Sequence, residues 1–264
     1  MHDLRADADN VDVWSDSDWT RRLNKHATTD RYTPAEIDDL PEPVQRYFTS
    51  AIAEGTILAK TVRLRMRGFI KVGMWLPFRA RQLSNPHVGF RWTARAVGLI
   101  SGLRPLRPRC GCDAVERRRQ IPCRNADGPD ISPSAAGRCG CEGVMAPTAL
   151  LPRFGVTWTA EDDQHITARL QLDATPATIG LTINAEGQVD AIAVRRWGDP
   201  RQTGTWSWHT FGGEFSAHRT FAGLTIPSRG RLGWDYGTSR WPAGEFFRYG
   251  ITELSIPTTQ ADAT

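Results

Sequence analysis

Residues 193–254 decide the fold class, and they read AVRRWGDPRQTGTWSWHTFGGEFSAHRTFAGLTIPSRGRLGWDYGTSRWPAGEFFRYGITEL. Runs of alternating aromatic or β-branched residues are interrupted at close intervals by GDP, GG, AG, PS and YGT. Such punctuation is typical of consecutive antiparallel strands joined by tight turns. We therefore predict that this third of the chain is entirely β.

The same two-residue period extends upstream. From residue 61, apolar Val62, Leu64, Met66 and Ile70 alternate with basic Arg63, Arg65, Arg67 and Lys71, which predicts a strand with one apolar and one basic face. Further strands are expected at 78–83, 90–96, 155–160, 166–172, 177–184 and 189–197, with a hairpin turn at 185–187. About ten strands without alternating helices predict a mainly β fold, a single large antiparallel curved sheet forming an open or half barrel.

Few helices are expected. Residues 1–30 are polar and acidic and predict a flexible arm. Residues 31–57 should form short helices, the first with Thr33 as N-cap, Pro34 at N1 and Glu36 completing a capping box. A helix at 134–151, interrupted at Pro147, should pack on the concave face of a β domain spanning 58–257, with a tail at 258–264.

Composition excludes several classes of protein. No window holds eighteen uninterrupted apolar residues, and the N-terminus lacks the basic and apolar regions of a secretory signal, so we expect a soluble cytoplasmic protein. The net charge of +4 is local, because residues 103–124 hold seven arginines and two acidic residues. The rest holds 26 basic and 27 acidic residues, which argues against a nucleic-acid partner.

All five cysteines lie between 110 and 141. Cys110, Cys112, Cys139 and Cys141 form two C-x-C pairs that could surround a zinc ion, and Cys123 is the fifth. The spacing differs from that of C-x₂-C zinc sites and no histidine lies nearby, so no metal is predicted and zinc stays an alternative. A disulfide cluster is disfavoured without a secretory signal.

A frameshift is a third interpretation of residues 103–124, which have no strand period although strands are expected on both sides. Residues 103–119 can be encoded so that a shift of one base reads FDRYGRGAGAMQWNGG, a sequence suited to a β domain. We interpret the segment as frame-shifted, natively or through a sequencing error. Its Cys and Arg residues would then carry no selected function.

His209 is the most reactive candidate in the C-terminal third. Asp199, Glu214, Asp235 or Glu245 could supply a carboxylate for acid–base catalysis. The favoured alternative is a strand histidine whose ring pairs with a neighbouring carbonyl, and Asp199 and Asp235 are expected in turns. No nucleophile-elbow, zincin, P-loop or dinucleotide motif is present, and no cofactor is predicted.

Tryptophan content indicates a different function, the binding of an apolar small molecule or lipid. A concave sheet could line a cavity with its aromatic residues, and basic or polar side chains could meet a head group. The candidate residues are Trp75, Trp92, Trp206, Trp208, Trp234, Arg196, Arg229 and His209. A third hypothesis is an interaction module that presents the basic face of the first strand. The oligomeric state is not predicted.

Several motifs resemble an uncharacterised bacterial family of unknown function, across roughly residues 40–255. They are VRLRMRGFIKVGMWLPFRARQ, ISG, NADGPDIS, SAAGR, PTALLPRFGVTW, RWGDP, TGTWSWHTFGGE, GLTIPSRGRLGW and RWPAGEFFRY. The resemblance implies a segment like FDRY…G.GAM.W after ISG, which the shifted frame returns. It also implies a strand order similar to that of half-barrel carriers of lipids or lipoproteins.

Resequencing of the gene tests the frameshift interpretation. We predict that the codons for residues 103–119 are compatible with the alternative frame FDRYGRGAGAMQWNGG. Codons that cannot encode that peptide after a one-base shift would contradict the interpretation.

Overall fold

A computed structural model of the chain describes residues 28–96, 137–172 and 175–257. The expected tail, most of the expected arm and the segment 103–124 lie outside the described residues, as do Cys110, Cys112 and Cys123. The frameshift interpretation is therefore not tested by the structure.

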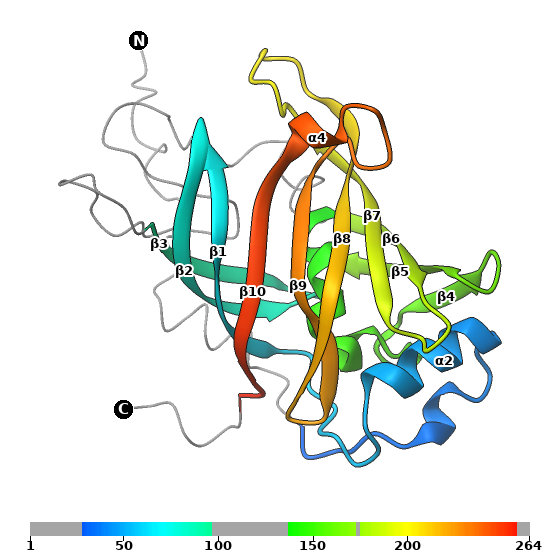
Figure 1. Cartoon of the computed structure of the whole chain (residues 1–264). Coiled ribbons are helices and arrows are strands. Elements are labelled where there is room, and N and C mark those ends of the chain that lie inside the picture. Colours follow the sequence, from blue (N-terminus) through cyan, green and yellow to red (C-terminus); the bar gives the residue numbers. More distant parts are fainter. Residues whose placement is uncertain (1–27, 97–136, 173–174, 258–264) are drawn as a thin grey trace, which may run out of the picture.

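Ten antiparallel strands form one sheet that does not close into a barrel (Figure 1). Neighbouring strands are consecutive in sequence except where β1 pairs with β10. The prediction of a mainly β, open antiparallel sheet is confirmed. In sheet order the strands are β3 (Gly89–Ala96), β2 (Met74–Asn85), β1 (Val62–Val72), β10 (Glu245–Ser255), β9 (Leu224–Trp234), β8 (Ser207–Phe221), β7 (Val189–Gly198), β6 (Thr175–Ile183), β5 (His165–Leu172) and β4 (Thr157–Ala160).

The predicted alternation is present in β1. Val62, Leu64 and Met66 are buried on the concave face, whereas Arg65 and Arg67 are exposed on the convex face. The hairpin to β2 turns at Gly73, with φ of 75°, so this strand begins at Met74 and not at the expected residue 78.

Glycines inside the strands bend the sheet, which corrects the expectation that Gly212-Gly213 marks a turn. Strand β8 runs unbroken through both residues, and the turn to β9 lies at Ala222-Gly223. A Cβ atom on Gly213 would lie 1.9 Å from the carbonyl oxygen of Arg231 in β9. Only glycine permits this approach, and register shifts in β8 and β10 add to the curvature.

Two short helices precede the sheet, as predicted. The 3₁₀ helix η1 (Pro34–Ile37) follows Thr33, whose side chain makes no capping hydrogen bond, so the expected capping box is wrong. Glu36 instead binds Arg153 at 3.2 Å. Helix α2 (Glu42–Ala51) buries Tyr47 and Phe48, which pack on Trp158 and close one end of the curved sheet (Figure 1).

The expected helix at 134–151 is a series of short helical turns on the concave face. Residues 137–141 are helical and continue into the 3₁₀ helices η2 (Glu142–Met145), η3 (Pro147–Leu150) and η4 (Pro152–Phe154). Pro147 and Pro152 each begin a new turn because neither can donate a backbone hydrogen bond. This segment, the helical insert, buries Leu150 and Leu151 against the sheet. A further short helix, α4 (Trp241–Gly244), precedes β10.

Substitution of Gly213 tests whether close strand approach bends the sheet. We expect Gly213→Ala to lower the free energy of unfolding by about 1–3 kcal/mol or more, because its methyl group overlaps a backbone oxygen. Gly180→Ala is the matched control, since its Cβ would meet only a backbone oxygen at an ordinary 3.5 Å. Urea unfolding of both variants checks this, and equal stabilities would contradict it.

Candidate functional site

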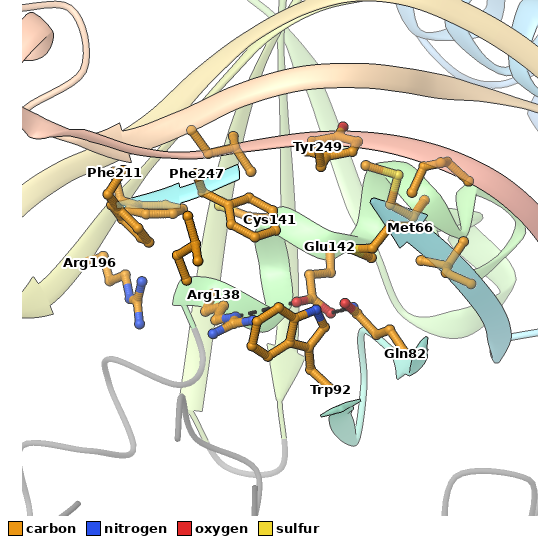
Figure 2. Close-up of a pocket in the computed structure, with 16 residues that line it drawn as sticks. Met66, Gln82, Trp92, Arg138, Cys141, Glu142, Arg196, Phe211, Phe247 and Tyr249 are labelled. Atoms are coloured by element: carbon orange, nitrogen blue, oxygen red, sulfur yellow. Dashed lines mark hydrogen bonds and ion pairs between the residues drawn. The ribbon is translucent and has the colours of Figure 1, made fainter. Parts of the chain in front are cut away.

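A largely apolar pocket lies between the concave face and the helical insert (Figure 2). Its cavity volume is about 190 Å³. This is smaller than the roughly 300–1,000 Å³ of sites for drug-sized molecules, so the pocket suits a small or slender ligand. Its walls come from seven strands and the insert, and the lining residues are Leu64, Met66, Ile70, Gln82, Trp92, Arg138, Cys141, Glu142, Met145, Arg196, Phe211, Leu232, Phe246, Phe247, Tyr249 and Ile251.

One wall of the pocket carries a buried polar cluster (Figure 2). The carboxylate of Glu142 accepts hydrogen bonds from Gln82 Nε2 at 2.5 Å and Ser84 Oγ at 2.8 Å. Arg138 Nε lies 3.4 Å from the other oxygen of that carboxylate, and its guanidinium stacks over Phe90 at 4.1 Å. The cluster therefore joins the helical insert to β2 and β3.

Burial shapes the protonation of this cluster. Desolvation raises the pKa of Glu142, and the nearby Arg138 and the hydroxyl of Ser84 oppose that rise. Burial likewise lowers the pKa of Arg138 and raises that of the Cys141 thiol to about 12. The Cys141 thiol is therefore protonated and unreactive at neutral pH.

Trp92 and Arg196 are the two predicted ligand-binding residues that line the pocket. The Trp92 side chain is buried, yet its indole Nε1 has no hydrogen-bond partner among the described residues. The Cζ atom of the Arg196 guanidinium lies 4.9 Å from the centroid of the Phe211 ring and 4.8 Å from that of the Trp234 ring. Trp234 thus contacts the pocket residues without lining the pocket itself.

The other predicted ligand-binding tryptophans and Arg229 lie elsewhere. Trp75 is near the β1–β2 hairpin tip, under the guanidinium of Arg248 at 4.5 Å. Trp208 is on the convex face against Trp197, and Trp206 precedes β8 in an exposed position. Arg229 is exposed on β9. A binding role for these residues stays a prediction.

His209 pairs with side chains and not with a carbonyl, so the favoured interpretation of its ring is wrong. Its Nε2 lies 2.8 Å from Ser207 Oγ, and its Nδ1 lies 3.3 Å from Asp235 Oδ1. Ser207 and His209 are two residues apart on β8 and therefore share a face. His209 is the register partner of Arg196, which places this trio on the concave face beyond Trp234.

Asp235 is the carboxylate that the structure brings to His209. It has a positive φ of 59° in the turn after β9, and its second oxygen faces Arg240 at 3.4 Å and Arg201 at 3.6 Å. Asp199 instead accepts backbone hydrogen bonds from Thr203 and Gly204 within its own turn.

Glu245 and Glu214, the other carboxylates predicted for His209, bind arginines. Glu245 pairs with Arg248 and Arg231. Glu214 pairs with Arg231 across the sheet.

Of the proposed zinc ligands, the structure describes Cys139 and Cys141, which are both buried. No cluster of three or more His, Cys, Asp or Glu residues arranged for a metal occurs among the described residues. Since Cys110 and Cys112 lie outside them, the zinc alternative stays a prediction. In the described part of the chain, no helix combines the length and apolarity that crossing a membrane requires.

Several pocket residues were missed by sequence reasoning. Arg138 and Gln82 end two of the motifs quoted above, SAAGR and VRLRMRGFIKVGMWLPFRARQ, but neither motif indicates a binding site, and Glu142 lies in no motif. Only the packing of the helical insert on the sheet brings the three together. Ser207 could have been found, because a serine two residues before a strand histidine must share its face.

Comparison with known proteins adds a family but no reaction. The sequence matches the family of unknown function DUF6544 over residues 30–246. Neither the curated proteins nor the solved structures contain a match. Because the matched region covers most of the chain, this protein belongs to the DUF6544 family.

Proposed function

We propose that this protein binds a small apolar molecule with a hydrogen-bond acceptor at one end, such as an acyl chain with a carboxylate or carbonyl group. The observation that carries the proposal is the Trp92 indole N–H, buried in the pocket wall without a partner among the described residues. A buried donor left unsatisfied costs about 1–3 kcal/mol, which a bound acceptor would recover.

The apolar walls suit a hydrocarbon chain. Phe211, Phe247 and Tyr249 lie on one side of the pocket, opposite the polar cluster (Figure 2). Each buried methylene contributes about 0.8 kcal/mol to binding. Affinity should therefore rise with chain length until the pocket is filled.

Charge on the polar wall favours an acceptor that is also an anion. Arg138 and Arg196 both line the pocket, and Glu142 is the one carboxylate among its described lining residues. Glu142 is already hydrogen-bonded by Gln82 and Ser84. A ligand carboxylate in the pocket would approach these guanidinium groups inside a low-dielectric site, where charge interactions are strong.

Titration with dodecanoate and dodecylammonium tests the proposal, since both have the same chain and only dodecanoate has an acceptor. We expect dodecanoate to bind more tightly in calorimetry. Trp92→Phe, which removes the N–H and keeps an aromatic ring, should weaken dodecanoate about tenfold, the value of one hydrogen bond to a charged group. Dodecylammonium binding should not change in this variant.

Filling the pocket gives the steric control. Leu232→Trp adds bulk at a partly buried lining position and should abolish binding, whereas Ile256→Trp, partly buried outside the pocket, should not. Equal binding of both probes, or dodecanoate binding that survives Leu232→Trp, would contradict the proposal.

A second candidate function is ester hydrolysis by Ser207, His209 and Asp235. Two distances support an activated serine: Ser207 Oγ lies 2.8 Å from His209 Nε2, and Asp235 Oδ1 lies 3.3 Å from His209 Nδ1, where it could orient the base. Ser207 Oγ would attack the ester carbonyl carbon while its proton passes to His209 Nε2. That proton would then go to the departing alkoxide, leaving an acyl-serine.

Water would complete the cycle by attacking the acyl-serine. His209 would take a proton from the water and return it to Ser207 Oγ as the carboxylic acid leaves. Asp235 would stabilise the imidazolium formed in both steps.

Fluorophosphonate labelling tests the hydrolase candidate separately from ligand binding, because a small probe needs no acyl pocket. We expect mass spectrometry to locate the label on Ser207, and Ser207→Ala and His209→Gln to abolish labelling and p-nitrophenyl acetate hydrolysis. Ser216→Ala and His218→Gln, on the same strand, should retain both. Absence of labelling, or labelling that survives Ser207→Ala, would rule the hydrolase candidate out.

A further inference from the structure

Four large apolar side chains are more than a third exposed in the described part of the chain. Met74 is 64% exposed, Phe69 49%, Trp208 48% and Trp206 38%. Single exposed apolar residues are common, but several that lie together indicate an interaction surface.

Strand register places all four at the same end of the sheet. Phe69 and Met74 lie at the β1–β2 hairpin tip, where Ile70 pairs with Phe247 near the start of β10. The start of β10 adjoins the end of β9, which pairs with β8 where β8 begins. Trp206 and Trp208 lie on either side of Ser207, the first residue of β8. Figure 1 shows this end, with the hairpin tip, the β7–β8 loop and α4, opposite the end that α2 closes.

The same end, here called the apolar rim, also presents basic side chains to solvent. Lys71 is exposed beside the hairpin turn at Gly73, whereas Arg67 and Arg79 are exposed six residues from that turn, near the middle of the sheet. Arg201 and Arg240, in the adjoining loops, have side chains that are 56% and 63% exposed.

Carboxylates at the apolar rim are directed inward. Asp235 and Glu245 are buried, with 10% and 7% of their side chains exposed, and both contact arginines. Asp199 is held by the backbone of its own loop. The described part of the rim therefore combines exposed apolar tips with an exposed positive charge.

We infer that the apolar rim docks on an anionic phospholipid bilayer. Aromatic side chains and methionine insert at the depth of the headgroups, and lysine and arginine bind the phosphate and carboxylate groups around them. Each basic residue near an anionic surface contributes about 1 kcal/mol. The apolar side chains come from two separate places on the rim, the β1–β2 hairpin and the start of β8, and a bilayer surface can receive both at once.

The rim is also adjacent to the pocket. Ile70, Phe246 and Phe247 line the pocket and belong to strand ends at the rim. A docked molecule would therefore hold its pocket close to the membrane, the source of acyl chains. Docking itself does not depend on the proposed ligand, so the two can be tested separately.

Vesicle co-sedimentation of the full chain tests the inference. We expect binding to phosphatidylcholine vesicles that contain phosphatidylserine, weaker binding to phosphatidylcholine alone, and loss of binding at high salt. The double variant Phe69→Ser/Met74→Ser should weaken binding about tenfold or more, because it removes two inserting side chains. Lys71→Glu should weaken binding to anionic vesicles only.

Arg219→Glu is the matched charge control, since Arg219 is exposed toward the other end of β8. It should bind vesicles like the unaltered protein. Circular dichroism and urea unfolding of each variant show that the fold is intact. Absence of vesicle binding, equal binding to neutral and anionic vesicles, or equal losses from Arg219→Glu and the rim variants would overturn the inference.

Discussion

The structure depends on the need to cover the single apolar face of a one-layer sheet. Ten strands in one layer present alternate apolar side chains to one side, and no second sheet covers them among the described residues. The chain solves this by bending the sheet at positions such as Gly213 and by placing the helical insert and α2 in the concavity. The helical insert packs tightly on the sheet at Leu150 but leaves space beside Trp92, and this space is the pocket.

The two faces and the two ends of the sheet consequently differ in chemistry. The concave face buries charged groups such as Arg196 and Asp235, whereas the convex face presents exposed arginines such as Arg65 and Arg67. One end is closed by α2, and the other carries exposed Met74 and Trp208. An asymmetric molecule with a pocket near one end is suited to taking a ligand from one direction.

Much of the fold could be predicted from local patterns, because the period of two in β1 identifies both a strand and its buried face. Sequence could not distinguish Gly212-Gly213 as a bend from a turn, since the same residues serve both. The residues of the site were harder to predict from the sequence. Trp92 and Trp208 look equivalent in sequence, and only strand register and sheet curvature place one in the pocket and the other on the convex face. His209 was identified with four candidate carboxylates, Asp235 among them. The sequence could not single out Asp235, because its place beside His209 depends on a turn with positive φ.

The central claim is that an acceptor on an apolar ligand meets the indole N–H of Trp92. The most direct measurement is the ¹⁵N–¹H spectrum of the tryptophan indoles during addition of dodecanoate, with the Trp92 resonance assigned by its loss in Trp92→Phe. A downfield proton shift of the Trp92 indole, with the exposed Trp206 indole unchanged, is the predicted result. A Trp92 resonance that does not move while dodecanoate binds would contradict the claim.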